Sequence, residues 1–332
     1  MTRLIQLRHP THNRRVALVA DNSLHLLSTY RSVFELAQAA MEAGLSAVSA
    51  AQNDASDRKL DYDSIYSGES EWRILAAFDH PSEPARCLVS GTGLTHKASA
   101  ENRQAMHKDT GTITDSMRMY ESGLEGGRPE PGKIGVMPEW FYKGLGTILR
   151  GHGDPLAVPA YAEDGGEEPE IAGAYIIDSS GAPRRVGMMA GNEFSDHKIE
   201  KKNYLYLAPS KLRTCAIGPE IVLDASFQAV PGLVRVERAG KDVWSKGIVS
   251  GEEKMSHTLA NLEHHHFKYE AHRRPGDAHV HFFGADAFSF GEGVTLQDGD
   301  QMIVEFAGFG RALRNPIHIE PRGETLIGVK PV

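Results

Sequence analysis

Cysteine is scarce in this chain of 332 residues: Cys87 and Cys215 are the two present, which excludes a disulfide framework and a CxxC zinc or redox motif. No apolar run is long enough to span a bilayer, and the first residues lack the apolar core of a signal peptide. Long basic runs are also missing, and the net charge is -8, so neither nucleic acid nor an anionic membrane is an expected partner. We therefore expect a soluble cytoplasmic protein.

What the chain does have is glycine and proline, 34 and 17 residues, between short apolar runs, which predicts a mainly β body. Residues 15–20 and 24–27 flank Asp21-Asn22 in the pattern of a β-hairpin. Ser32 and Glu35 form a capping-box pattern, and the helix that follows is predicted to run to about Ser49. A change in the residue pattern near Pro81 predicts a small N-terminal domain, 1–84, and a catalytic domain, 85–332.

Three glutamates form the most informative pattern. Glu168 and Glu170 are two residues apart, and a strand would point both to one face. Like charges in that position are unfavourable unless a cation lies between them, and Mg²⁺ prefers carboxylate oxygens. Glu193, at the end of an apolar and small run, would supply a third ligand and leave about half of an octahedral shell open for substrate. The alternative is a solvent-facing acidic edge, because the stretch 163–170 holds five acids.

Two further residues are candidates for chemistry. Lys211 near a metal could hold a substrate oxygen or stabilise an enolate, although most lysines are simply solvated. Glu139 is flanked by bulky aromatics, and an acid on an apolar strand can serve as a general acid or base. The alternative for Glu139 is a surface position on an edge strand.

Histidines crowd the region 264–281. His279 and His281 would share one face of a strand, as in some β-barrel metal sites, and His264, His265, His266 and His272 lie close in sequence. No spaced acid and third histidine complete that pattern. We therefore interpret the region as a polar, partly exposed strand or an interface patch.

Several runs, in order, resemble the fumarylacetoacetate hydrolase superfamily over about residues 85–320. The matching segments are Pro138-Glu-Trp-Phe-Tyr-Lys143, Gly151-His-Gly-Asp-Pro155, Glu168-x-Glu170, Asn192-Glu193, Lys211, Cys215-Ala-Ile-Gly-Pro219 and Gly308-Phe-Gly310. The resemblance implies that Glu168, Glu170 and Glu193 bind the metal, with Glu193 one carbon longer than the family's usual aspartate. Lys211 falls where the family has its active-site lysine.

Within the superfamily, the stretch Ile199 to Lys211 resembles the branch that contains 2-keto-3-deoxy-arabinonate dehydratase and the GguC-like proteins of sugar catabolism. Gly93-Leu-Thr-His-Lys-Ala-Ser99, followed by Arg103, corresponds to a catalytic loop of that branch. His96 and Lys97 replace the Tyr-Glu pair of that loop, and the loop of the hydrolase branch is not matched either. By this correspondence His96 is a catalytic candidate, and Ser99, Arg103 and Lys97 are candidates for binding the substrate.

The resemblance implies an α+β, mainly β fold, a mixed β-sandwich roll that is usually dimeric, with Mg²⁺, or Mn²⁺ or Ca²⁺, as cofactor. It also implies a 2-keto acid as substrate. We expect a metal-dependent dehydratase acting on a 2-keto-3-deoxy sugar acid, in which Glu139 and His96 share the proton transfers and Lys211 holds the keto or carboxylate oxygen. The alternatives are a hydrolase that cleaves a C–C bond of a 2,4-diketo acid, and a sugar-acid-binding protein without catalysis.

Overall fold

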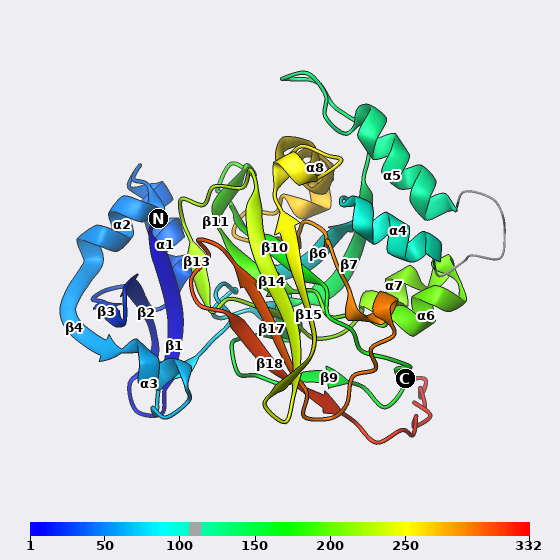
Figure 1. The fold of residues 1–332 in the computed structure, drawn as a ribbon. Helices are drawn as coiled ribbons and strands as arrows, with labels where there is room; N and C mark the ends of the chain where they lie inside the picture. Colours follow the sequence, from blue (N-terminus) through cyan, green and yellow to red (C-terminus); the bar gives the residue numbers. More distant parts are fainter. Residues whose placement is uncertain (106–113) are drawn as a thin grey trace.

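The computed structural model describes residues 1–105 and 114–332, without the side chains of residues 102, 103 and 105. Within these ranges, two sheets carry the fold (Figure 1). The larger has 13 strands: β1 (Arg3–His9), β2 (Asn13–Ala20), β3 (Ser23–Leu27), β4 (Ala55–Asp61), β5 (Arg73–Ile74), β6 (Cys87–Gly93), β7 (Glu139–Leu145), β8 (Leu149–Arg150), β10 (Pro169–Ile177), β11 (Pro183–Asn192), β12 (Cys215–Ile217), β13 (Glu220–Val222) and β16 (Ala278–Phe282).

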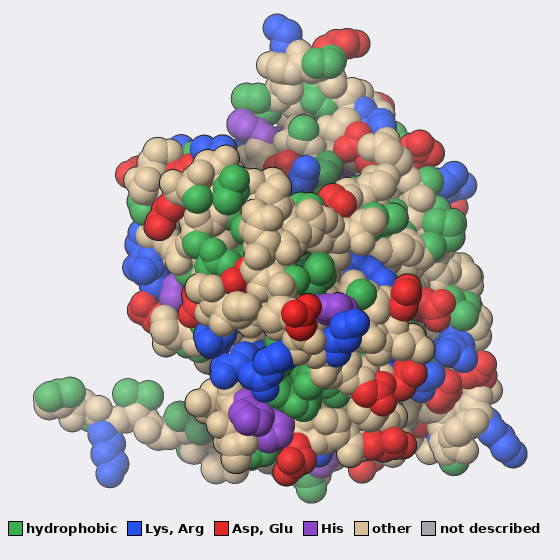
Figure 2. All heavy atoms as spheres, turned by 90° about the vertical axis from the view of Figure 1, so that its left-hand side faces the viewer, with side chains coloured by type: hydrophobic (Ala, Val, Ile, Leu, Met, Phe, Trp, Pro, Cys, Tyr) green, Lys and Arg blue, Asp and Glu red, His purple; other side chains and the backbone are tan. Residues whose placement is uncertain are grey.

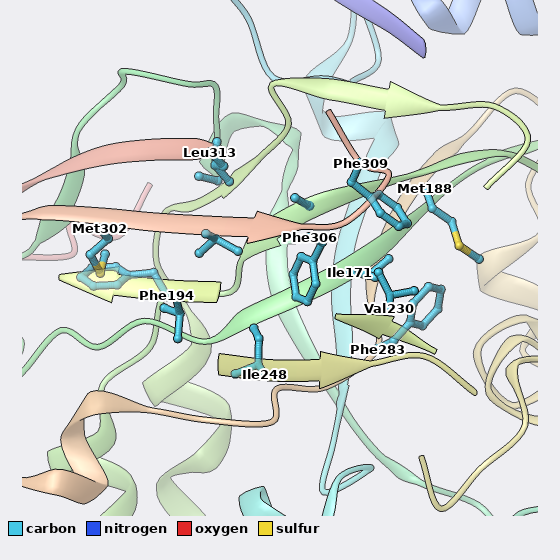
Figure 3. Close-up of a cluster of buried hydrophobic side chains, with 14 of the residues drawn as sticks. Ile171, Met188, Phe194, Val230, Ile248, Phe283, Met302, Phe306, Phe309 and Leu313 are labelled. Atoms are coloured by element: carbon cyan, nitrogen blue, oxygen red, sulfur yellow. The ribbon is translucent and has the colours of Figure 1, made fainter. Parts of the chain in front are cut away.

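The second sheet has five strands in the order β15-β14-β17-β18-β9, namely β15 (Lys241–Ser250), β14 (Val230–Arg238), β17 (Gln301–Phe306), β18 (Leu313–Ile319) and β9 (Leu156–Val158). Its apolar side chains pack against one face of β10 and β11, and Figure 3 shows Ile171 and Met188 among Val230, Ile248 and Phe306. This is the core of a β-sandwich. The predicted α+β, mainly β architecture is confirmed.

Helices cover the remaining faces. They are α1 (Val33–Glu42), α2 (Ala47–Asp54), α3 (Tyr62–Tyr66), α4 (Lys97–Ala105), α5 (Asp115–Gly126), α6 (His197–Lys202), α7 (Leu207–Lys211) and α8 (Leu259–Phe267), with short 3-10 turns such as η4 (Tyr204–Tyr206) and η6 (Glu270–His272). Helix α1 buries Phe34, Leu36 and Ala37 against the face of the large sheet that carries Ala172 and Ile176. None of the helices in the described ranges is long and apolar enough to cross a membrane.

The N-terminal predictions hold in part. Strands β2 and β3 form the expected hairpin, with Ala20 opposite Ser23, and Ser32 caps α1 with the reciprocal contact from Glu35. The helix ends at Glu42, however, and not near Ser49 as predicted, because Gly44 adopts φ +66° and a new helix starts after the Ser46 cap. Strand β1 pairs with β13, so these elements continue the large sheet. The division at residue 84 stays a prediction.

The histidine region forms a buried cluster on one face of the large sheet. His281 Nδ1 lies 2.8 Å from Ser90 Oγ, its Nε2 lies 2.7 Å from Thr92 Oγ1, and His266 Nε2 lies 3.1 Å from His279 Nδ1. His266, His279 and His281 are each 1% exposed, so our interpretation of a partly exposed strand is wrong for them. Alternation along β6 and β7 places Ser90, Thr92 and Trp140 on this face and Gly91, Gly93 and Glu139 on the other.

Burial lowers the pKa of His279 to about 4 and that of His281 to about 3, with neighbouring imidazoles adding to the effect. Both rings are therefore neutral in the folded protein, whereas a histidine in an unfolded chain has a pKa of about 6.5. Below pH 6.5 the unfolded state binds more protons, so folding stability is lost as pH falls from there toward pH 4.

We predict that His281→Gln or His279→Gln reduces the slope of unfolding free energy against pH by about 1.4 kcal/mol per pH unit between pH 6 and pH 5. The measurement is urea unfolding in EDTA at several pH values. His264→Gln, an exposed residue of the same helix as His266, is the matched control and should keep the wild-type slope. A slope equal to wild type in both buried variants contradicts the neutral assignment.

A candidate metal and active site

The ends of the β10–β11 hairpin bring the three glutamates together. Glu170 lies opposite Gly191 in the ladder, and the backbone N–H of Glu193 donates to the carbonyl of Glu168 at 2.9 Å. One carboxylate oxygen from each of Glu168, Glu170 and Glu193 lies within 4.8 Å of the other two. The three residues are at most 5% exposed, so the alternative of a solvent-facing acidic edge is wrong.

Two buried lysines hold this cluster. Lys211 Nζ lies 2.5 Å from Glu168 Oε1 and 2.7 Å from Glu193 Oε2, and Lys143 Nζ lies 2.5 Å from Glu193 Oε1. Lys143 also donates to the carbonyls of Phe194 and Lys211, at 2.6 and 3.0 Å. Lys143 was named in the sequence only as part of a family segment, and its position on β7 opposite the hairpin end is what makes it part of the site.

The electrostatics of the cluster favour a bound cation. Burial raises the pKa of Glu193 to about 7, although Lys143 and Lys211 oppose the shift. The pKa of Glu170 is raised well above its usual value by burial and by the charges of Glu193 and Glu168. Two ammonium groups face three carboxylates here, with Glu200 as a fourth at 3.5 Å from Lys211 Nζ, and an all-oxygen donor set suits a hard divalent ion such as Mg²⁺. The residues present therefore fit the implied metal.

His197 is a residue that sequence reasoning missed. Its Nε2 lies 3.1 Å from Glu168 Oε1, and a side chain at Gly166 would collide with the imidazole ring. Burial by itself would lower the pKa of His197, but the contact with Glu168 and the charge of Glu200 together outweigh burial and raise it. The imidazole ring of His197 thus helps to fix the orientation of the Glu168 carboxylate. The only signal in the sequence is the position of His197 four residues after Glu193.

Glu139 lies at the start of β7 and is 4% exposed, which excludes the surface position. Its partner in the ladder is Gly93, where a Cβ would come within 1.8 Å of Glu139 Oε1 and so displace the carboxylate. The hydroxyl of Tyr204 donates to Glu139 Oε2 at 2.5 Å. Phe141, two residues along the same face, lies under Lys211 Nζ at 4.7 Å from the ring centroid. Glu139 and Lys211 therefore flank one region of the sheet face.

The loop after β6 contributes His96. It is 1% exposed, its Nδ1 lies 3.0 Å from Thr95 Oγ1, and among the described residues its Nε2 has no hydrogen-bond partner. Burial lowers the pKa of His96 to about 4, with Asp286 opposing the shift. Thr95 Oγ1 donates to the carbonyl of Phe283, and the next residue, Gly284, donates its N–H to Glu170 Oε2 at 2.7 Å. The His96 loop is thus tied to the segment that contacts Glu170.

The substrate-binding candidates on α4 differ in position. Ser99 is buried. The Lys97 side chain is 74% exposed and pairs with Glu101 at 3.2 Å, so the structure does not bring it into the group of buried residues. The side chain of Arg103 lies outside the described part of the chain. The roles of these three residues stay predictions.

Comparisons with solved structures identify this fold. The apo form of 2-keto-3-deoxy-D-arabinonate dehydratase superposes with a TM-score of 0.70 at 19% identity, covering 96% of this chain and 99% of the other. The same enzyme complexed with magnesium and 2,5-dioxopentanoate gives 0.70 at 20% identity, with 97% and 100% covered. 2-Hydroxyhepta-2,4-diene-1,7-dioate isomerase from Mycobacterium marinum gives 0.60 at 16% identity, with 97% and 100% covered.

No family model matches the chain, and no curated protein matches it. Identities of 16–20% establish the fold and leave the reaction to be argued from the site. The resemblance to the fumarylacetoacetate hydrolase superfamily is confirmed at the level of the fold, over nearly the whole chain.

Proposed function

We propose that this protein is a metal-dependent dehydratase acting on a 2-keto-3-deoxy sugar acid such as 2-keto-3-deoxy-arabinonate. The observation that carries the proposal is the buried cluster of Glu168, Glu170 and Glu193 with Lys143 and Lys211, together with the buried acid Glu139, which shares a face of β7 with the Phe141 ring under Lys211. The structural neighbour complexed with magnesium and 2,5-dioxopentanoate supports it. That compound differs in composition from a 2-keto-3-deoxy-pentonate by one water.

Glu168, Glu170 and Glu193 would hold Mg²⁺, which when bound supplies positive charge that polarises a 2-keto acid and acidifies its C3 hydrogens. The Glu139 carboxylate takes a proton from C3, and the electron pair of that C–H bond forms the C2–C3 double bond of an enolate, with the negative charge on the keto oxygen. When the C=O bond re-forms, the C2–C3 electron pair becomes the C3–C4 double bond. The C4–O bond breaks, and Glu139 returns the proton to the departing hydroxyl, which leaves as water. Lys211 places an ammonium beside the oxygen on which negative charge develops.

His96 is neutral near pH 7 because its pKa is about 4, and it is therefore a poor proton donor. We assign it to accepting a hydrogen bond from a substrate hydroxyl through Nε2. His96 and Lys97 replace the tyrosine and glutamate of the dehydratase branch, so different side chains would contact the substrate hydroxyls. Ser99, buried on the same helix-loop unit, is the neighbouring candidate for substrate contact.

The second candidate is a hydrolase that cleaves a C–C bond of a 2,4-diketo acid. The neutral buried imidazole of His96 favours it, because such a ring could take a proton from an attacking water. A sugar-acid-binding protein without catalysis would retain the metal cluster but show no turnover. We further expect a homodimer, which remains a proposal.

The first experiment incubates the protein and Mg²⁺ with a panel of 2-keto-3-deoxy pentonates and hexonates, followed by mass spectrometry. We expect one member to lose one water, and EDTA to abolish the loss. Pyruvate release from a 2,4-diketo acid in a parallel reaction would select the hydrolase. No mass change in either panel, with Mg²⁺ binding demonstrated by calorimetry, would favour the third hypothesis, a sugar-acid-binding protein without catalysis.

Glu139→Gln is expected to lower kcat by about 10²–10⁴-fold, because the amide cannot accept the C3 proton, while the Kd for Mg²⁺ changes by less than about threefold. Deuterium uptake at C3 of the 2-keto acid in D₂O should fall in parallel. Glu121→Gln, an exposed glutamate of α5, is the control. Equal losses of turnover and of Mg²⁺ affinity would assign Glu139 to metal binding instead.

Tyr204→Phe removes the hydroxyl that donates to Glu139 Oε2. We expect kcat to fall about tenfold with little change in KM, because the carboxylate is less precisely held, and Tyr206→Phe on the same turn should leave kcat unchanged. In a Glu139→Gln background Tyr204→Phe should have no further effect on kcat. An additive loss in the double variant would mean that Tyr204 acts on stability rather than through Glu139.

A further inference from the structure

A cavity of about 690 Å³ lies where the N-terminal elements meet the second sheet, away from the glutamate cluster. One wall comes from the end of α3 and from β5, with Tyr66 and Arg73. The other comes from the loop between β8 and β9 and from β17 and β18, with His152, Gln301 and Arg314. Its volume falls within the range of small-molecule sites. No residue of the proposed reaction lines it.

Stacked rings form a fixed part of the lining. The rings of Tyr66 and His152 lie 4.1 Å apart at 27°, and the Tyr66 hydroxyl donates to the carbonyl of Ala312 at 2.7 Å. His152 Nδ1 accepts from the backbone N–H of Arg314 at 3.3 Å, and Nε2 lies 3.1 Å from the carbonyl of Tyr66. His152 is therefore neutral, with its proton on Nε2, and both ring nitrogens are used by the protein.

Two guanidinium groups line this cavity. The lining contains two arginines and one carboxylate, Asp154, whose Oδ2 is already an acceptor for the N–H of Gly151 at 2.8 Å. Arg73 donates from Nη1 to the carbonyl of Gly68 at 3.1 Å, and Arg314 Nη1 lies 3.5 Å from Glu237 Oε2. Each guanidinium has five N–H donors, so these contacts leave donors for a ligand.

The pKa of His152 reflects these nearby guanidinium groups. Burial lowers the pKa of His152 to about 4, and the charges of Arg314 and Arg311 lower it further. The side of the molecule that carries the N-terminal elements otherwise has basic and acidic side chains interspersed (Figure 2), and the whole chain has a net charge of -8. The lining of the cavity thus has two arginines and one carboxylate, Asp154, and Glu237 lies beside Arg314.

We propose that this cavity binds a small organic anion that carries a carboxylate or a phosphate group. Arg73 and Arg314 hold the anionic group from opposite walls, Gln301 offers an amide to its polar atoms, and the Tyr66–His152 pair supplies a flat apolar surface. Planar guanidinium groups suit both carboxylate and phosphate oxygens. A ligand in this position touches the N-terminal elements and the β18 strand together, so its binding stabilises their contact.

The test is isothermal titration calorimetry at low ionic strength with inorganic phosphate, D-gluconate and 6-phosphogluconate as separate probes. EDTA in every sample keeps metal ions away from the glutamate cluster. We expect saturable one-to-one binding of at least one probe, weakened at least tenfold by Arg73→Gln and by Arg314→Gln. Arg118→Gln, an exposed arginine of α5, is the control and should bind as wild type does. Phosphate and gluconate distinguish the two anionic groups.

Histidine-selective NMR locates the probe. Resonances of His152, assigned with His152→Gln, should shift during the titration, because an anion beside the ring changes its electrostatic surroundings. Thermal melting of each variant checks that it is folded. Absence of saturable binding, or binding that survives both arginine substitutions, overturns the proposal. Light scattering that shows a dimer in wild type and a monomer in both arginine variants would also overturn it, because a second copy would then fill the cavity.

Discussion

The burial of three carboxylates against two lysines is the constraint on which the rest of this structure depends. Charges removed from water are tolerated only with close partners, and removal of one partner from such a group typically costs about 3–5 kcal/mol. The partners come from separate elements: Glu168 and Glu193 from the two ends of the β10–β11 hairpin, Lys143 from β7 and Lys211 from α7. The hairpin, the β6–β7 pair and the α6–α7 segment must therefore assemble together, because none of them can bury its own charge alone.

Strand alternation separates two kinds of buried polar chemistry on the same strands. On β6 and β7, glycines at 91 and 93 open space for Phe141 and Glu139 on the face toward Lys211, whereas Ser90, Thr92 and Trp140 on the other face contact the histidine cluster. The cluster consists of neutral rings that hydrogen-bond to one another and to hydroxyls, which explains how so many imidazoles are buried without a counter-charge. The buried histidines of the region 264–281 are thus, in this fold, part of the packing on the sheet face opposite Glu139.

Patterns within one or two elements could be predicted from the sequence, and contacts between distant elements could not. The spacing of Glu168 and Glu170 and the capping box at Ser32 both express local geometry. The structure brings the two carboxylates together and forms the capping box, as predicted. The roles of Lys143, His197 and Tyr204 could not be predicted, because each contacts a residue 29 to 65 positions away in the sequence. Burial misled us in the same way. His279 and His281 look partly solvent-exposed in the sequence, but they are buried on the face of the sheet that His266 of α8 contacts.

The N-terminal elements contribute no side chain to the glutamate cluster, yet they are bound to the same sheet. Strand β1 pairs with β13, and β13 in turn pairs with β11, whose last residue precedes Glu193. Buried Glu220 strengthens this junction: it accepts from Arg3 at 2.8 Å, from the Tyr62 hydroxyl at 2.8 Å and from the backbone N–H of Arg311 at 3.0 Å. An edge of the sheet that would otherwise present unpaired N–H and C=O groups is covered in this way. Glu220 fixes both the N-terminal elements and the turn that leads into β18. The walls of the arginine-lined cavity are therefore held by the same residue that joins these elements to the strands leading to Glu193.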